Sequence, residues 1–101
     1  MTLHLVVHQP EPGTDPDIVD ETRATLADAV WEVAESHWAP ADEVMMVSSD
    51  LSADYLLAHF RRALSRRGVT DPGFLIVAPM AERPALLGAP PAVKAWMAEA
   101  L

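Results

Sequence analysis

The sequence predicts a single small α/β domain over residues 1–101, built on a three-stranded parallel sheet that is flanked by helices. Three observations predict it. The chain has the length of one domain, half of its residues are hydrophobic, and short apolar runs alternate with helix-length segments in the order β-α-β-α-β-α. No two-residue hairpin signal separates any two of these runs, so each connection is long enough for a right-handed crossover. The alternative is a ferredoxin-like α+β fold, which needs a β-hairpin that the sequence does not signal.

The first strand and the first helix are predicted from the amino-terminal part of the chain. Residues 3–8 alternate as a strand does, with leucine and valine on one side and histidine and valine on the other. Asp15 followed by Pro16 is typical of a helix start, because the aspartate caps free N–H groups and proline loses no hydrogen bond at the first helical position. We expect this helix to run to about Trp38, because Pro40 would end it.

The remaining elements follow the same alternation. The apolar run "VMMV" predicts a strand over residues 43–48 that is covered on both faces. Ser52 is a suitable cap for a helix over residues 53–67. The most continuously apolar run predicts a third strand over residues 74–78, and a proline after a long connection predicts a last helix over residues 91–101.

The charge of the chain restricts its partners. The net charge is −8: residues 1–54 hold twelve acidic residues against Arg23, a net of −11, whereas residues 55–101 hold six basic residues against three acidic ones, a net of +3. Phosphate backbones would repel so acidic a chain, so no nucleic-acid partner is expected. Acidic and basic halves suit self-association, and the overall acidity suits a basic protein partner.

Several function classes are not signalled. The glycine-rich patterns of phosphate loops and the spacing of metal ligands do not occur, so we expect neither a cofactor nor a metal. The chain has no cysteine, no apolar run long enough to cross a membrane and no recognisable leader. We therefore expect a soluble, cytoplasmic protein without a membrane partner.

Polar residues follow the predicted strands, at the edge where open parallel sheets bind ligands. The candidates for a catalytic site are His8, Ser48, Ser49 and Asp50. In that arrangement His8 would act as the base, Asp50 would orient it and one serine would be the nucleophile or a ligand contact. Neither serine lies in a G-x-S-x-G turn, and strand ends are commonly polar because the backbone reaches water there. Further candidates for ligand binding are Gln9, Glu82 and Arg83.

Two features favour an interaction surface. Trp31 and Trp38 lie seven residues apart on the predicted first helix, on a stripe away from its core face. This stripe could pack against the last helix or form an interface, where tryptophan is enriched. Leu86 and Leu87 stand in the proline-rich connection before the last helix, where they could dock a partner or fold over the core.

We therefore expect a small non-catalytic interaction protein, such as an accessory, regulatory or inhibitor-like subunit, that forms a homodimer or binds another protein. The missing catalytic motifs, the charge asymmetry and the tryptophan stripe support this function. The alternative is a small enzyme or small-molecule-binding domain with its site at the strand ends. The two differ in whether the strand-end side chains converge on a pocket.

Overall fold

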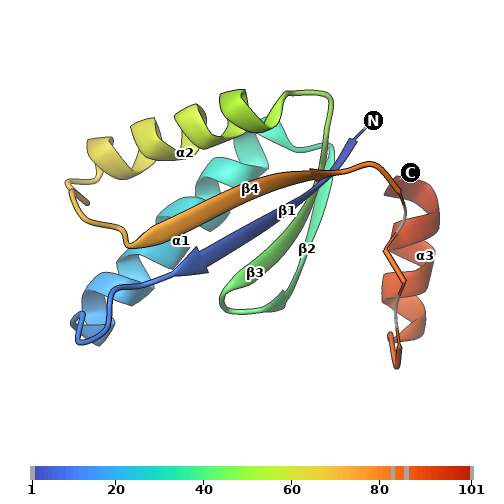
Figure 1. The fold of residues 1–101 in the computed structure, drawn as a ribbon, viewed down its shortest axis with the longest axis horizontal. Coiled ribbons are helices and arrows are strands. Elements are labelled where there is room, and N and C mark those ends of the chain that lie inside the picture. Colours follow the sequence, from blue (N-terminus) through green and yellow to red (C-terminus); the bar gives the residue numbers. More distant parts are fainter. Residues whose placement is uncertain (1, 83, 86, 101) are drawn as a thin grey trace.

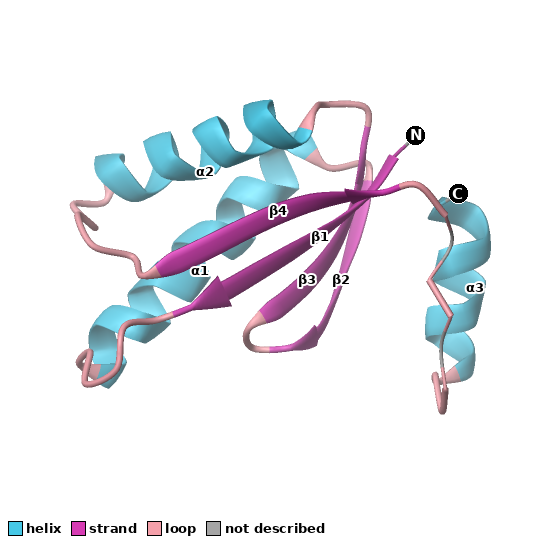
Figure 2. Ribbon diagram, in the orientation of Figure 1, coloured by secondary structure: helices cyan, strands magenta, loops and turns pink. Residues whose placement is uncertain are grey.

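Residues 2–82, 84–85 and 87–100 are described in the computed structural model, and within them the chain forms four strands and three helices (Figure 1). Figure 2 shows how the helices, strands and loops alternate along the chain. In chain order the elements are β1 (Thr2–Gln9), α1 (Pro16–Val33), β2 (Ser36–Ala41), β3 (Val44–Ser49), α2 (Ala53–Arg66), β4 (Phe74–Met80) and α3 (Pro91–Ala100). None of the described helices is both long enough and apolar enough to cross a membrane.

The strands form one sheet in the order β2-β3-β1-β4, and every pair in it is antiparallel. The expected three-stranded parallel sheet is therefore wrong. The observed β-α-β-β-α-β order and strand arrangement agree in outline with the ferredoxin-like alternative, to which α3 is added. Helices α1 and α2 lie on one face of the sheet, and α3 lies on the other side (Figure 1).

The main error in the sequence prediction is the end of the first helix. α1 ends at Val33 instead of Trp38, and Ala34 is already extended, with φ −99° and ψ 142°. The Ser49 hydroxyl donates to the Val33 carbonyl at 3.0 Å, which satisfies one of the carbonyls that a helix end leaves free. The chain then enters β2, which the sequence did not signal as a strand.

A tight turn joins β2 to β3. Ala41 pairs with Val44, so Asp42 and Glu43 are the two turn residues. No described residue other than glycine has a positive φ, so this turn is not one of the glycine-dependent types that hairpins favour. The pairing is irregular between Trp38 and Ala41, which accommodates the unusual turn.

Both predicted helix caps are confirmed. The Asp17 N–H donates to Asp15 Oδ1 at 2.8 Å at the start of α1. The Tyr55 N–H donates to the Ser52 hydroxyl at 3.1 Å at the start of α2. These short-range signals are reliable because the capping group lies within three residues of the N–H that it satisfies.

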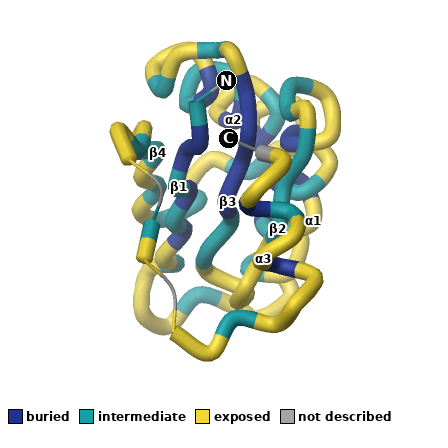
Figure 3. Tube along the Cα trace, turned by 90° about the vertical axis from the view of Figure 1, so that its right-hand side faces the viewer, coloured by how far each residue is buried: buried dark blue, intermediate teal, exposed yellow. Residues whose placement is uncertain are grey.

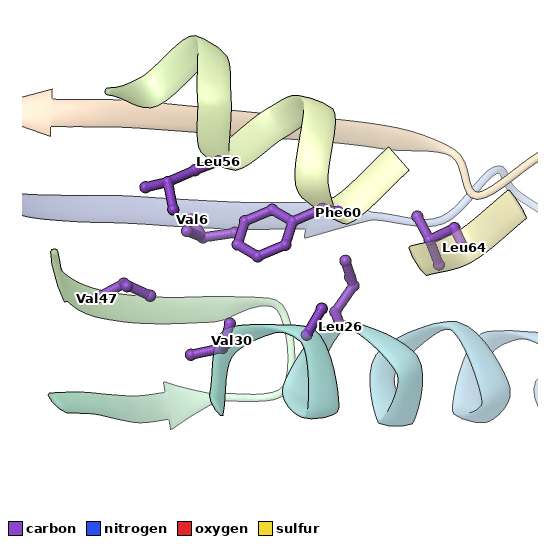
Figure 4. Packing of buried hydrophobic residues seen from close by; sticks show 8 residues of the cluster. Val6, Leu26, Val30, Val47, Leu56, Phe60 and Leu64 are labelled. Atoms are coloured by element: carbon purple, nitrogen blue, oxygen red, sulfur yellow. The ribbon is translucent and has the colours of Figure 1, made fainter. Parts of the chain in front are cut away.

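The main core lies between the sheet and the helices α1 and α2. Figure 4 shows Phe60 of α2 pointing toward Val6 of β1, with Leu26 of α1 on the opposite side. Every buried residue of the main core is at most 3% exposed. They are Val6, Leu26, Ala29, Val30, Val47, Leu56, Phe60 and Leu64.

A smaller apolar cluster lies on the other face of the sheet, under α3. Its buried members are Leu3 of β1, Met46 of β3 and Met97 of α3. Trp38 and Trp96 pack at its margin. Seen from the α3 side, buried positions concentrate in the central strands β1 and β3 (Figure 3). Because both faces of these strands are covered there, alternating residues of β1 enter different clusters.

Candidate functional site

The structure does not bring the candidate catalytic residues together. β1 and β3 are antiparallel, so Leu3 pairs with Ser48 at one end of the ladder, while His8 lies beyond the Val7–Val44 pair at the other. His8 lies five residue steps along the strand from Leu3, a distance of about 17 Å at roughly 3.4 Å per step. Ser48 and its neighbours therefore lie too far from His8 for a hydrogen-bonded catalytic set.

Ser49 has a structural role that accounts for its position. Its hydroxyl donates to the Val33 carbonyl and accepts the Leu51 N–H at 3.2 Å, so it closes α1 and starts the approach to α2. Ser48 and Ser49 are each 1% exposed. Among the candidate ligand contacts, Gln9 and Glu82 are exposed, whereas Arg83 lies outside the described residues.

His8 is buried instead of solvated, with 3% of its surface exposed. Its Nε2 lies 2.6 Å from the carbonyl oxygen of Pro72, and its backbone N–H donates to the carbonyl of Glu43 at 2.8 Å. A carbonyl can only accept, so Nε2 carries the hydrogen of this bond. In the neutral ring, Nδ1 is then a lone-pair acceptor. His8 thus ties the loop before β4 to the end of β1.

His4 lies on the same face of β1 and is 1% exposed. Neither of its ring nitrogens has a hydrogen-bond partner among the described residues. Burial lowers the pKa of His4 below its ordinary value of 6.5, and the nearby backbone of Leu51 and Ser49 only partly opposes this effect. His4 is therefore a neutral, buried ring whose protonation would oppose folding.

We expect His4 to make the protein less stable in mild acid. Because the pKa is lower in the folded state, the unfolded state binds more protons once the pH falls below about 6.5. The free energy of unfolding should therefore fall from pH 7 to pH 5, by no more than about 1.4 kcal/mol per pH unit for this one group. It should level off once the folded-state pKa is passed. Urea unfolding at a series of pH values measures this dependence.

The variant His4→Leu should show a flatter profile over the same range, because leucine is also apolar but does not titrate. His37→Leu is the matched control, since His37 is half-buried on the edge strand β2. It should keep the slope of the unmodified protein. Equal slopes for all three proteins would contradict the assignment.

The two candidate interface tryptophans lie on different elements. Trp31 is on α1, is 73% exposed and contacts the ring of His37 edge-on, with ring centres 4.6 Å apart. Trp38 is on β2, opposite Met46, and packs against the cluster under α3. They therefore do not share the helix stripe that the sequence predicted. Leu87 is fully exposed, and Leu86 lies outside the described residues.

The face of the sheet away from α1 and α2, here called the open face, is apolar along its central and β4 strands. By strand alternation and register, Val7 of β1 lies beside Ile76 of β4, and Gln9 lies beside Phe74. α3 covers the part around Leu3, but leaves Phe74 59% exposed and Ile76 40% exposed. The apolar residues of the open face are Leu3, Leu5, Val7, Trp38, Val44, Met46, Phe74, Ile76, Ala78 and Met80.

A groove of about 430 Å³ continues this face beneath the connection from β4 to α3. Its lining includes Leu5, Val44 and Met80 of the sheet, together with Pro84, Leu87 and Val93 of the connection and α3. All the described residues that line the groove are apolar or glycine. The open face and the groove together make a continuous apolar surface that the described chain covers only in part.

Neither a metal site nor a similarity to known proteins identifies the function. Among the described residues, no three His, Asp or Glu side chains gather where they could hold a metal ion. Comparison with protein families, curated proteins and solved structures gave no match.

Proposed function

We propose that this protein is a non-catalytic interaction protein that self-associates through its open face. The observation that carries the proposal is the uncovered apolar surface around Ile76 and Phe74 on β4. Large apolar side chains that stand together on a sheet face are typical of protein interfaces, because burying them removes apolar area from water. The separation of His8 from Ser48 removes the support for the catalytic alternative at the strand ends.

The charge distribution allows a second copy of the chain to bind at the open face. Each copy carries a net charge of −8, so most approaches between two copies are repulsive. By register, the strand residues on the open face around Val7 and Ile76 carry no charged side chain among the described residues. Two copies can therefore meet there without placing like charges opposite each other.

Symmetry supports the same partner. In a two-fold dimer one surface serves both copies, so the apolar strip of β4 would lie against its own equivalent. Residues from Phe74 to Ala78 also form an edge of the sheet, whose unpaired backbone groups need protection. A copy packed on the open face beside β4 would bury these side chains and would stand next to this edge, where it hinders pairing with a further strand.

We expect Ile76→Glu to weaken self-association at least tenfold, because a carboxylate would have to be desolvated in an apolar interface. Sedimentation equilibrium over a range of concentrations measures the dimer dissociation constant. Ile18→Glu is a matched control: it makes the same substitution at a 50% exposed isoleucine on α1, in the opposite layer. It adds the same charge and should leave the dimer intact.

Two results would overturn the proposal. One is a monomeric unmodified protein at high concentration. The other is a dimer that Trp31→Glu disrupts and Ile76→Glu leaves unchanged, which would place the interface on α1. If the protein is monomeric and binds a basic protein through Ile76, the open face binds a different protein and not a second copy.

A further inference from the structure

β4 is an edge strand, and alternate backbone groups along it have no neighbouring strand in the described chain. Its one neighbour there is β1. The His8 N–H donates to the Glu43 carbonyl at 2.8 Å, so the backbone of His8 points toward β3. Backbone groups alternate in direction along an antiparallel ladder, so His8 and Leu75 are a pair without hydrogen bonds between β1 and β4. The N–H and C=O groups of Leu75 therefore point outward from the sheet, and those of Val77 do the same.

This free edge is short, because both of its ends are blocked. Pro79 is the next outward residue after Val77, and proline has no N–H to donate. Gly73 precedes the strand with a φ of +89°, which lies outside the extended conformation of a strand. Leu75 and Val77 are therefore the positions at which an added strand can form both backbone hydrogen bonds.

A groove of about 520 Å³, here called the α2–β4 groove, lies next to this edge. Its lining includes Leu57, Arg61 and Leu64, which recur every three or four residues and so share one side of α2, together with Gly73 and Leu75. Figure 1 shows α2 running beside β4. None of the residues of β1, all of which are described, lines the groove, so it opens on the free side of β4. Its volume is within the range of binding clefts.

The charge of the α2–β4 groove determines which partner fits it. Arg61 is the one charged residue among the described residues that line it. In the described part of the chain no carboxylate pairs with Arg61, whereas Arg67 lies 3.2 Å from Asp28. α2 carries three arginines against one aspartate, although the whole chain has a net charge of −8. The groove therefore suits a partner with a carboxylate. A second copy paired through its own β4, Phe74–Met80, would bring no acidic side chain to Arg61.

We propose that an extended peptide segment of a partner protein adds to β4 as a further antiparallel strand and lies in the α2–β4 groove. Addition of a strand to a free sheet edge is a recurring mode of peptide recognition. Antiparallel pairing matches every other pair in this sheet and is the more stable kind. The peptide backbone would bond to the outward N–H and C=O groups of Leu75 and Val77.

The side chains of the peptide follow from this pairing. Residues that stand opposite each other share a face, so the peptide residues opposite Val77 and Leu75 would point to the side of the sheet that α2 covers. Apolar side chains fit there. The groove extends from Leu75 back to Gly73, and the peptide runs in the opposite direction to β4. The acidic residue for Arg61 therefore follows the apolar pair, in the pattern apolar-x-apolar-x-acidic.

The probe is a fluorescently labelled peptide with blocked ends, Thr-Val-Thr-Leu-Thr-Glu-Thr, whose valine, leucine and glutamate share one face. In the proposed pairing the leucine N–H faces β4, and the N–H of the threonine after it faces solvent. N-methylation of the leucine should therefore weaken saturable binding at least tenfold, and N-methylation of that threonine should have a much smaller effect. Fluorescence anisotropy measures both dissociation constants.

Arg61→Gln should weaken binding of this peptide about threefold, the size expected of an exposed ion pair. The same variant should not change the binding of a peptide in which glutamine replaces the glutamate. Arg62→Gln is the matched control, because Arg62 is the adjacent exposed arginine and does not line the groove. It should leave the binding of both peptides unchanged.

Amide hydrogen exchange shows where the peptide lies. The Leu75 and Val77 amides should exchange quickly in the free protein and at least tenfold more slowly with saturating peptide. The Ala78 amide, which pairs with β1, should change little. A copy on the open face would stand next to the β4 edge and compete with the peptide. Exchange and binding are therefore also measured in Ile76→Glu, whose altered side chain lies on the open face and leaves the backbone groups at Leu75 and Val77 in place.

Several results would contradict the proposal. Absence of saturable binding, or equal effects of the two N-methyl groups, would show that the peptide does not pair with β4. Equal binding of the glutamate and glutamine peptides would remove Arg61 from the site. Slow exchange at Leu75 and Val77 without peptide, in proportion to protein concentration, would show that a second copy covers the edge. If self-association through the open face fails, each of these measurements still tests the peptide site, because none requires a dimer.

Discussion

Phe60→Ala is expected to lower the free energy of unfolding by about 3–5 kcal/mol, the usual cost of emptying a phenylalanine site in a core. Phe60 is fully buried, and its ring lies between α2, the sheet and α1 (Figure 4). Val6 and Leu26 approach it from two other elements, so the surrounding chain cannot collapse into the space without moving a strand or a helix. The loss is a large share of the stability of a domain of this size.

Urea unfolding followed by circular dichroism measures this effect. Tyr55→Ala is the matched control, because it truncates an aromatic residue on the same helix that is 49% exposed. Arg62 Cζ lies 5.8 Å from the centre of its ring, a cation–π interaction at the surface worth about 0.5–1 kcal/mol. A similar loss for both variants would contradict the placement of Phe60 at the centre of the core.

The sequence predicted those elements that local chemistry determines. The starts of α1 and α2 follow from Asp15 and Ser52, whose side chains bond to N–H groups two or three residues away. β1, β3 and β4 follow from apolar runs that are too short for helices. Neither kind of signal requires knowledge of the rest of the fold.

β2 could not be predicted in this way, because its residues become a strand only through pairing with β3. The segment Ser36–Ala41 contains Pro40 and two alanines, which are uncommon in strands, and its turn lacks glycine and asparagine. Pro40 is tolerated because β2 is an edge strand. The sequence therefore gave no strand signal for β2, because what makes it a strand is its pairing with β3 and not its own composition.

This one missed strand also changed the predicted site. A hairpin between β2 and β3 reverses the direction of β3 relative to β1, and so turns a parallel arrangement into an antiparallel one. Ser48 consequently lies at the opposite end of the sheet from His8. Arg23, which lines a cavity of about 310 Å³ together with His8, had no signal in the sequence, because only the folded chain brings α1 against the turn at Glu43.

Gly73→Ala is expected to lower the free energy of unfolding by about 2–5 kcal/mol, for two reasons that add. Gly73 has a φ of +89°, a conformation that costs other residues about 1–2 kcal/mol. A Cβ at this position would also lie 2.5 Å from the Gln9 carbonyl oxygen and 2.8 Å from Pro10 Cα. Both obstacles are backbone atoms, so relief requires movement of the chain that follows β1, at a further cost of about 1–3 kcal/mol.

Gly68→Ala separates the two contributions. Gly68 has a similar φ of +79°, but a Cβ there would meet nothing within 4 Å, so this variant should lose only about 1–2 kcal/mol. Gly73 also adjoins Pro72, whose carbonyl accepts the His8 Nε2 hydrogen. The same shift that relieves the clash should therefore weaken this bond and change the His8 ring ¹⁵N signals in Gly73→Ala, while Gly68→Ala leaves them unchanged. Equal losses of stability in the two variants, with unchanged His8 signals in both, would show that the loop before β4 does not press against the end of β1.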